Sequence, residues 1–331
     1  MSILKKIKDA NCLDFPRILQ IEITDKCPLH CPQCYRLELA EHHMDYELLK
    51  KITIEAINNG TRLFVLNGGE PLLYYKINEL LDYLKKIPVY INCFSSGIGL
   101  NERILHSLKE NERIHFCLSL NGSTEEINSK SRDGYKSTIK AMKLLSENKI
   151  NYGVHWVARH DNIMDLHRLI QMLENNGCSF LSIGSNKLTY KRVIDSRMSD
   201  LDFIKLIEIV RSYTEKLSIM FENCFPEMNY RMFGLNNIFD GCGAGRTMCH
   251  VTTDGHFAPC THLHYYEKFN SLSEYWNNSK VLSHLRHRNL RNNVDCSNCQ
   301  MVNNCKMCIA SSIESYCDFD KGNAQCYVKG R

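Results

Sequence analysis

The sequence contains no long run of apolar residues, and this absence bears on where the protein works. The N-terminal stretch MSILKKIKDANCLDF has no apolar segment as long as that of a signal peptide. No later segment is apolar over enough residues to span a bilayer. The usual signatures of secretion and membrane insertion are therefore excluded, and we expect a cytoplasmic protein with no membrane partner.

A strong charge of one sign is also missing. The formal net charge is +4 over 331 residues, too small to indicate binding to nucleic acid. Low-complexity segments and evident linkers are absent too. We therefore expect no nucleic-acid partner, and the chain length suggests one large domain with a smaller one beside it.

Cysteine, by contrast, is abundant and unevenly placed. The chain has 17 cysteines, of which three fall within residues 27–34 and nine lie between Cys242 and Cys326. A reducing compartment disfavours disulfides, and an odd number cannot pair completely within one chain. Such clustering indicates metal ligation rather than small core residues.

Strand-like and helix-like patterns alternate between residue 18 and about residue 220. This alternation predicts a parallel sheet with helices outside it. Six such units are fewer than a closed eight-stranded barrel needs. We therefore predict an α/β fold, a partial (β/α)6 TIM-like barrel over residues 1–223, followed by a small cysteine-rich, metal-binding domain over 224–331. The predicted strands lie near residues 19–23, 63–66, 89–94, 114–120, 154–157 and 180–183.

The first cysteine cluster directly follows the first predicted strand, at the face where parallel βα folds place their active sites. Cys27, Cys31 and Cys34 form a C-x3-C-x2-C loop. Three thiolates can hold three corners of a 4Fe–4S cube and leave the fourth iron open. A zinc site with His30 or a distant residue as fourth ligand is the alternative.

This loop, followed by the aromatic Tyr35, resembles the signature of the radical S-adenosylmethionine (SAM) superfamily. The resemblance implies that the open iron chelates the amino and carboxylate groups of SAM. It also implies an electron donor such as flavodoxin or ferredoxin, reductive cleavage of the sulfonium, and a 5′-deoxyadenosyl radical that abstracts hydrogen from a substrate.

Further motifs resemble those of the family. Gly68, Gly69, Glu70 and Pro71 match the GGEP motif that binds the SAM amino group, with Glu70 as an acceptor for the ammonium. The segment 119–122 resembles S-x-D-G with Asn in place of Asp, and the resemblance implies that Ser119 and Arg132 hold the SAM carboxylate. An ordinary surface position for Arg132 is the alternative. Ser96 belongs to a turn that resembles a polar turn near the ribose of SAM in members of the family.

The C-terminal cysteines resemble the SPASM extension of radical SAM enzymes that modify peptides. That resemblance covers Gly241 to Cys326 and implies two auxiliary 4Fe–4S clusters. Assigned by order along the chain, the ligands of the first cluster would be Cys242, Cys249, Cys260 and Cys308. The ligands of the second would be Cys296, Cys299, Cys305 and Cys326. The spacing between Cys305 and Cys308 departs from the family pattern, and Cys317 is unassigned. Zinc is again the alternative. Four other cysteines are expected in the core: Cys12, Cys93, Cys117 and Cys178.

The resemblance implies an enzyme that matures a ribosomally made peptide by a thioether or carbon–carbon crosslink, or by epimerisation. Epimerisation needs a thiol that returns a hydrogen atom, and Cys224 or Cys317 could supply it. Only 26 residues precede Cys27, too few for a leader-recognition domain, so leader binding would need a separate protein or would not occur.

Several alternatives remain open from the sequence. Formylglycine formation, as in sulfatase-maturing enzymes, is disfavoured because Thr261 stands where those relatives have an Asp base after the cysteine that corresponds to Cys260. A small-molecule dehydrogenase is a further enzymatic possibility. A zinc-binding interaction protein is the alternative without catalysis.

Overall fold

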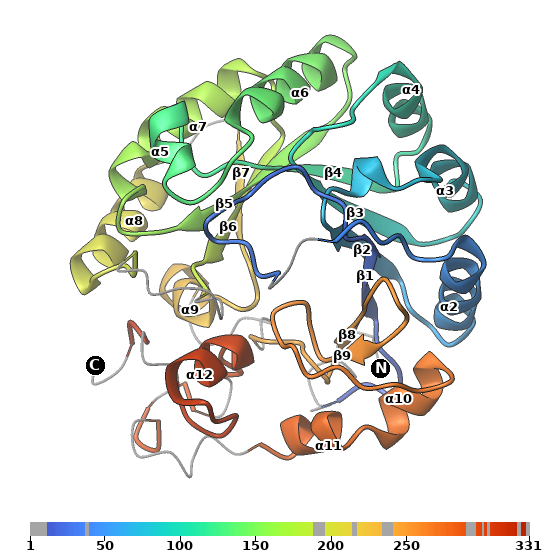
Figure 1. Ribbon diagram of the computed structural model, residues 1–331. Helices are drawn as coiled ribbons and strands as arrows, with labels where there is room; N and C mark the ends of the chain where they lie inside the picture. The colour runs from blue at the N-terminus through green and yellow to red at the C-terminus, as the bar shows by residue number, and fades with distance from the viewer. Residues whose placement is uncertain are drawn as a thin grey trace, which may run out of the picture.

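A computed structural model describes residues 12–36, 40–187, 196–213, 217–233, 241–288, 296–299, 301–302, 305–322 and 326–328. Its main feature is a curved sheet surrounded by helices (Figure 1). The strand order is β7-β6-β5-β4-β3-β2-β1-β8-β9, and all neighbours pair in parallel except β8 and β9. The α/β partial barrel predicted from the sequence is confirmed.

Strands β1 to β7 follow one another in the chain as they do in the sheet. Most of their residues are buried, as in β4, because a parallel sheet is covered on both faces. All six predicted strands are confirmed, and β7 is a seventh that the sequence analysis missed. The strands are β1 (Ile18–Thr24), β2 (Leu63–Gly68), β3 (Tyr90–Ser95), β4 (Ile114–Ser119), β5 (Tyr152–Ala158), β6 (Phe180–Ser185) and β7 (Ser218–Phe221).

Amphipathic helices connect the strands and form the outer layer of the ring (Figure 1). In the helix after β1, Leu49, Ile52 and Ala56 face the sheet, and the Asp45 side chain caps the N-terminus by accepting from the Leu48 N–H at 2.9 Å. The helices are α2 (Tyr46–Asn58), η1 (Pro71–Leu73), α3 (Ile77–Leu84), α4 (Glu102–Glu110), α5 (Glu125–Ser129), α6 (Tyr135–Glu147), η2 (Ile163–Asp165), α7 (Leu166–Asn175), α8 (Asp200–Ser212) and α9 (Pro226–Phe233).

The C-terminal region extends the sheet at its β1 edge. Strand β8 (Met248–Val251) pairs in parallel with β1, placing Cys249 opposite Leu19, and β9 (Phe257–Ala258) pairs antiparallel with β8. Helices α10 (Leu272–Asn278), α11 (Lys280–Arg286) and α12 (Ile309–Tyr316) follow. These elements lie on the side of the ring that α2 to α8 leave open (Figure 1). The proposed division at residues 223/224 stays a prediction.

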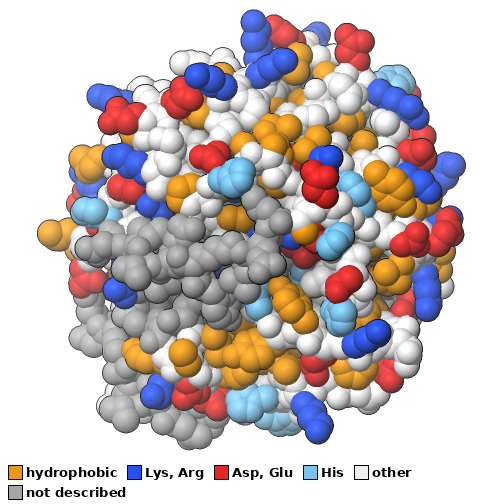
Figure 2. Space-filling view, in the orientation of Figure 1, with side chains coloured by type: hydrophobic (Ala, Val, Ile, Leu, Met, Phe, Trp, Pro, Cys, Tyr) orange, Lys and Arg blue, Asp and Glu red, His pale blue; other side chains and the backbone are white. Residues whose placement is uncertain are grey.

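The surface carries charges of both signs. On the part of the face in Figure 2 that the structure describes, Lys and Arg side chains are interspersed with Asp and Glu. Within the described ranges, no helix combines the length and the apolar character needed to cross a membrane.

Candidate active site

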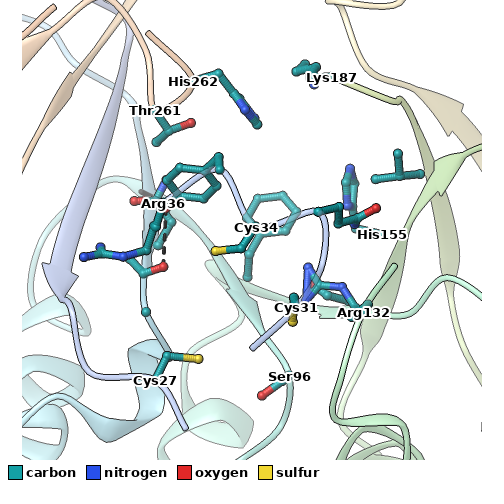
Figure 3. A pocket seen from close by; sticks show the side chains of 18 of the residues that line it. Cys27, Cys31, Cys34, Arg36, Ser96, Arg132, His155, Lys187, Thr261 and His262 are labelled. Carbon is teal, nitrogen blue, oxygen red and sulfur yellow. Dashed lines mark hydrogen bonds between the residues drawn. The ribbon is translucent and has the colours of Figure 1, made fainter. Parts of the chain in front are cut away.

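A pocket lies at the C-terminal ends of the parallel strands, and the cysteine loop after β1 forms one wall of it (Figure 3). The structure gathers nearly all of the predicted cofactor residues here. Those that line the pocket are Cys27, Cys31, Cys34, Tyr35, Gly68, Gly69, Glu70, Ser96, Ser119 and Arg132. Pro71 is buried at the start of η1 and is not part of the lining.

The three cysteines of the loop point toward a common space (Figure 3). Burial raises the pKa of the Cys27 thiol to about 11, with smaller contributions from Glu70 and the other two cysteines. Burial also raises the pKa of Cys31, although the Arg132 guanidinium opposes this shift. Both shifts show that the site disfavours bare thiolates and favours thiolates that are neutralised by a positive partner.

Within the described residues, no three His, Cys, Asp or Glu side chains are arranged to bind a single metal ion. His30, the proposed fourth zinc ligand, is exposed, and its backbone N–H donates to Asp133 at 2.7 Å. A 4Fe–4S cube is wider than one ion, so its thiolate ligands stand further apart. The donor set of Cys27, Cys31 and Cys34 therefore fits a cube with one open iron better than zinc.

Residues just after the cysteine loop anchor it to β1. The Arg36 guanidinium forms ion pairs with Glu22 at 2.7 Å and with Asp25 at 2.6 Å, and all three side chains are largely buried. The C-terminal region joins this network, because His250 lies 3.6 Å from Glu22 and the Thr253 hydroxyl donates to Asp25 at 3.0 Å. The loop is thus held from both the barrel and the β8–β9 hairpin.

Glu70 is buried and bonded entirely within the chain. One carboxylate oxygen accepts from the Ser95 hydroxyl at 2.6 Å and from the Leu72 N–H at 3.2 Å, and the other accepts from the Ser96 N–H and hydroxyl. These donors occupy the acceptor positions of a carboxylate. The predicted role of Glu70 as acceptor for the SAM ammonium is therefore revised, because the carboxylate locks the end of β2 to the end of β3.

The two glycines of this motif are required by close backbone approach. Gly68 has a φ of 132°, and a Cβ there would lie 2.2 Å from the Thr24 carbonyl oxygen. A Cβ on Gly69 would lie 2.3 Å from the carbonyl oxygen of Lys26. Without side chains, the end of β2 packs directly against the start of the cysteine loop.

Arg132 is positioned by the turn after β4. Its backbone carbonyl accepts from the Asn128 side chain at 2.7 Å, and its buried Nε atom has no hydrogen-bond partner among the residues that the structure describes. Ser119, at the end of β4, lines the same pocket. A half-buried guanidinium that lines the pocket is suited to binding a carboxylate from a ligand.

Three pocket residues that the sequence analysis missed come from neighbouring strands. Glu222, just after β7, accepts from Lys187 at 3.0 Å and lies 2.9 Å from His155 Nε2 on β5. Burial acts to raise the pKa of Glu222, but Lys187 and His155 hold it well below its ordinary value. In Figure 3, Lys187 and His155 lie across the pocket from Cys27. His155 and Lys187 lie in or just after predicted strands, which was a usable signal, whereas Glu222 follows the unrecognised β7.

The β9 side of the pocket carries Thr261 and His262. The Thr261 N–H donates to Gln20 on β1 at 3.1 Å, which ties this wall to the barrel. The His262 ring lies 5.2 Å from that of Tyr35. Burial and then the Lys187 charge lower the pKa of His262 to about 3, so the ring is neutral at physiological pH.

The C-terminal cysteines converge in two groups. In the first thiol group, Cys242, Cys260 and Cys308 share a buried cluster with Cys224, whose thiol lies within hydrogen-bonding reach of Cys308. In the second, burial and Glu227 raise the pKa of the Cys305 thiol, and nearby Cys296, Cys299 and Cys326 add to this shift. The second grouping matches the expected set, whereas the first contains Cys224 in place of Cys249.

Cys249 and Cys317 lie apart from these groups. Cys249 is fully buried on β8 within the main hydrophobic core, and Arg286 is the charged residue that acts on its thiol. Cys317 is exposed at the C-terminus of α12, with a φ of 51°. The remaining cysteines follow expectation: Cys93, Cys117 and Cys178 are buried, and Cys12 is half-buried.

A known protein family matches the part of the chain that carries the cysteine loop. The sequence profile of the Radical SAM superfamily matches residues 21–173, which include the second half of β1, the whole cysteine loop and strands β2 to β5. Residues 21–173 are therefore a radical SAM domain. A curated relative, PqqA peptide cyclase of Streptomyces rochei, is 34% identical over 108 residues, which are 32% of this chain and 30% of that protein.

Solved structures share the fold over nearly the whole chain. Streptococcus suis SuiB bound to S-adenosylmethionine superposes with a TM-score of 0.81 at 20% identity, covering 97% of this chain and 80% of that one. SuiB bound to its precursor peptide SuiA gives 0.79 at 18% identity, covering 97% and 78%. The anSMEcpe protein with bound AdoMet gives 0.73 at 17% identity, covering 94% and 90%. At these identities, the likeness establishes the fold.

Proposed function

We propose that the protein is a radical SAM enzyme that modifies a ribosomally made peptide. One observation carries this proposal: Cys27, Cys31 and Cys34 share a pocket with Ser119 and the half-buried Arg132, at the C-terminal ends of parallel strands. The match of residues 21–173 to the Radical SAM superfamily supports this proposal, because the cysteine loop lies within those residues.

In this proposal the thiolates of Cys27, Cys31 and Cys34 hold a 4Fe–4S cluster. When bound, the cluster and SAM together supply a 5′-deoxyadenosyl radical that abstracts a hydrogen atom from the substrate. The chain's own residues hold the loop in place. The Arg36 ion pairs fix its C-terminal end, and the hydrogen bonds of Gln33 to Ser131 and His30 to Asp133 fix its outer side.

Arg132 and Ser119 are proposed to bind the SAM carboxylate. The Arg132 Nε atom has an unused donor, and a guanidinium can contact both oxygens of a carboxylate. With Glu70 committed to Ser95 and Ser96, backbone carbonyls near Gly68 and Gly69 are the acceptors left for the SAM ammonium. Ser96 donates to Glu70 and thereby supports the ribose side of the pocket.

We propose that both thiol groups of the C-terminal region hold auxiliary clusters. The first would use Cys224, Cys242, Cys260 and Cys308, and the second Cys296, Cys299, Cys305 and Cys326. Each set provides four thiolates, which close a cube. This assignment leaves Cys249 as a core residue and removes Cys224 from the candidates for a hydrogen-atom donor.

The proposed substrate is a peptide, and the proposed reaction is crosslinking. Support comes from a relative named as a peptide cyclase and from a structure of the same fold bound to a precursor peptide. Formylglycine formation is less well supported. Thr261 lines the pocket at the position where sulfatase-maturing relatives carry an acidic base, and a threonine hydroxyl is a poor proton acceptor at neutral pH.

The test begins with SAM cleavage in the absence of oxygen. Protein, SAM and a chemical reductant, or reduced flavodoxin or ferredoxin, are expected to yield 5′-deoxyadenosine, which is quantified by chromatography. The Cys27/Cys31/Cys34→Ala variant should yield none. Cys178→Ala is the matched control, because Cys178 is a buried cysteine outside the pocket and should retain the yield. Equal yields from the parent and the triple variant would exclude the proposal.

Mass spectrometry of a candidate peptide then identifies the modification. A mass lower by two hydrogens indicates a crosslink or an oxidation, and fragmentation distinguishes these outcomes. An unchanged mass with one deuterium gained from heavy water indicates epimerisation instead. If 5′-deoxyadenosine forms but no peptide from a neighbouring reading frame changes, SAM cleavage stands and the peptide assignment is wrong.

A further inference from the structure

Lys187 lies between the pocket and the first thiol group, which comprises Cys224, Cys242, Cys260 and Cys308. It lines the pocket, and only 10% of its side chain is exposed. Its ammonium pairs with Glu222 at 3.0 Å, and the same Glu222 oxygen accepts from the Cys224 thiol at 3.0 Å. A single carboxylate therefore joins the lysine to the thiol group.

The neighbouring residues hold this pair in a defined position. Glu222 also bonds to His155, and Gly184 lies beside both of them. A Cβ at Gly184 would lie 2.8 Å from Glu222 Oε2 and 2.9 Å from His155 Nε2. The sheet therefore leaves room for the carboxylate only because residue 184 has no side chain, which indicates a site built around Glu222.

Lys187 and Arg288 both act electrostatically on the first thiol group, but they act on different cysteines. The Lys187 charge acts on Cys224, Cys260 and Cys308. The Arg288 charge acts on Cys242 and Cys308, and also on Cys305 of the second thiol group. Glu222 is the carboxylate that acts on Cys224. Lys187 is thus tied to the first group through Glu222, which also bonds Cys224, whereas the Arg288 charge reaches cysteines of both groups.

We propose that Lys187 is a positioning residue whose fixed positive charge raises the reduction potential of the cluster held by the first thiol group. This inference rests on the proposed function, because it assigns an iron–sulfur cluster to those thiols. A nearby cation stabilises the more negative, reduced form of a cluster. Glu222 orients the ammonium and partly offsets its charge.

The proposed reaction gives this charge a role. Forming a crosslink removes two hydrogens from the peptide: one leaves as a hydrogen atom, and the other as a proton and an electron. The electron needs an acceptor near the pocket. Because Lys187 borders both the pocket and the first thiol group, its charge makes the nearer cluster the easier one to reduce.

The experiment measures potentials rather than turnover. In the full-length Cys27/Cys31/Cys34→Ala background, only auxiliary iron remains, and each auxiliary potential is followed by electron paramagnetic resonance during a redox titration. Lys187→Met should lower one potential and leave the other unchanged. Lys187→Arg, which keeps the charge, should match the parent. Glu222→Gln should raise the same potential, and Arg288→Met should lower both.

The outcomes separate this inference from the function on which it rests. Two intact auxiliary clusters with potentials unmoved by Lys187→Met would overturn the role of Lys187 and leave the proposed function standing. Equal shifts of both potentials in Lys187→Met would also overturn it, since the effect would then not be local. A chain that holds no auxiliary iron overturns the auxiliary sites and this inference together.

Discussion

Arg36 Nη1 lies 2.7 Å from Glu22 Oε1, and this ion pair joins the end of the cysteine loop to the middle of the first barrel strand. The pair is largely buried, and Asp25 and His250 complete the network around it. A loop that must hold three thiolates in fixed positions needs such an anchor, because only backbone and side-chain contacts restrain it.

Removing the Arg36 charge should therefore destabilise the protein strongly. Arg36→Met leaves two buried carboxylates without their partner, and we expect a loss of about 3–5 kcal/mol. Lys85→Met is the matched control, because Lys85 pairs with Glu110 on the surface and its removal should lower the stability far less. Chemical unfolding and iron content check the prediction, and similar losses in both variants would contradict it.

Asp161 should make stability depend on acid pH through its contact with Arg159. Both carboxylate oxygens accept from the buried Arg159 guanidinium at 2.9 Å. Burial acts to raise the pKa of Asp161, but Arg159 lowers it below its ordinary value of 3.8. A depressed pKa stabilises the fold above pH 3.8, and this contribution is lost as the pH falls through the folded-state value.

Asp161→Asn should consequently lower the Tm at pH 7. The difference from the parent should shrink as the pH drops below about 4, where the parent's carboxyl becomes protonated. Thermal unfolding at stepped pH measures this difference. Asp133→Asn is a useful comparison, since that carboxylate accepts from an exposed backbone N–H rather than from a buried guanidinium. A pH-independent difference for Asp161→Asn would contradict the argument.

Gly184→Ala should impair peptide modification more than SAM cleavage. The added methyl would collide with Glu222 and His155 and displace them. His155 lies across the pocket from Cys27, so the cysteine loop would not be touched (Figure 3). Ser182→Ala, on the same strand and face, adds no atom and should behave like the parent. The check is the ratio of modified peptide to 5′-deoxyadenosine; an unchanged ratio in Gly184→Ala would refute the prediction.

Glu70→Gln should destabilise the fold rather than merely weaken SAM binding. In the variant, an amide NH2 group would replace one of the two carboxylate oxygens that now accept hydrogen bonds. The buried donors that face this oxygen would lose their acceptor, at a cost of about 1–3 kcal/mol in the free energy of unfolding. We expect a lower Tm in the absence of SAM. A variant with the parent's Tm and a selective loss of SAM affinity would instead restore the ammonium-binding role for Glu70.

Cys224 and Cys249 should differ in their effect on iron content. In the Cys27/Cys31/Cys34→Ala background, Cys224→Ser should lower bound iron and sulfide, because Cys224 belongs to the first thiol group. Cys249→Ser should retain both, since Cys249 lies in the apolar core. Iron and sulfide are measured in both variants after anaerobic purification. Loss of iron in Cys249→Ser but not in Cys224→Ser would reinstate the assignment by order along the chain.

Particular residues show how far the sequence could be interpreted alone. Strands such as β4 were predictable because their buried residues form short apolar runs. Strand β7 was not, since only Phe221 of its four residues is buried. The cysteine loop was recognisable because its three ligands are close in sequence, whereas Glu222, His155 and Lys187 come from three strands and have no common motif.

The sequence by itself determined the class of fold, the cysteine loop and ten of the residues that line the pocket, because these depend on local periodicity and short spacing. Only the tertiary structure decided that Cys224 joins Cys308, that Cys249 stays in the core, and that Glu70 is already saturated. Those relationships depend on which strand ends lie next to each other in space, and local sequence patterns do not predict contacts between residues that are far apart in the chain.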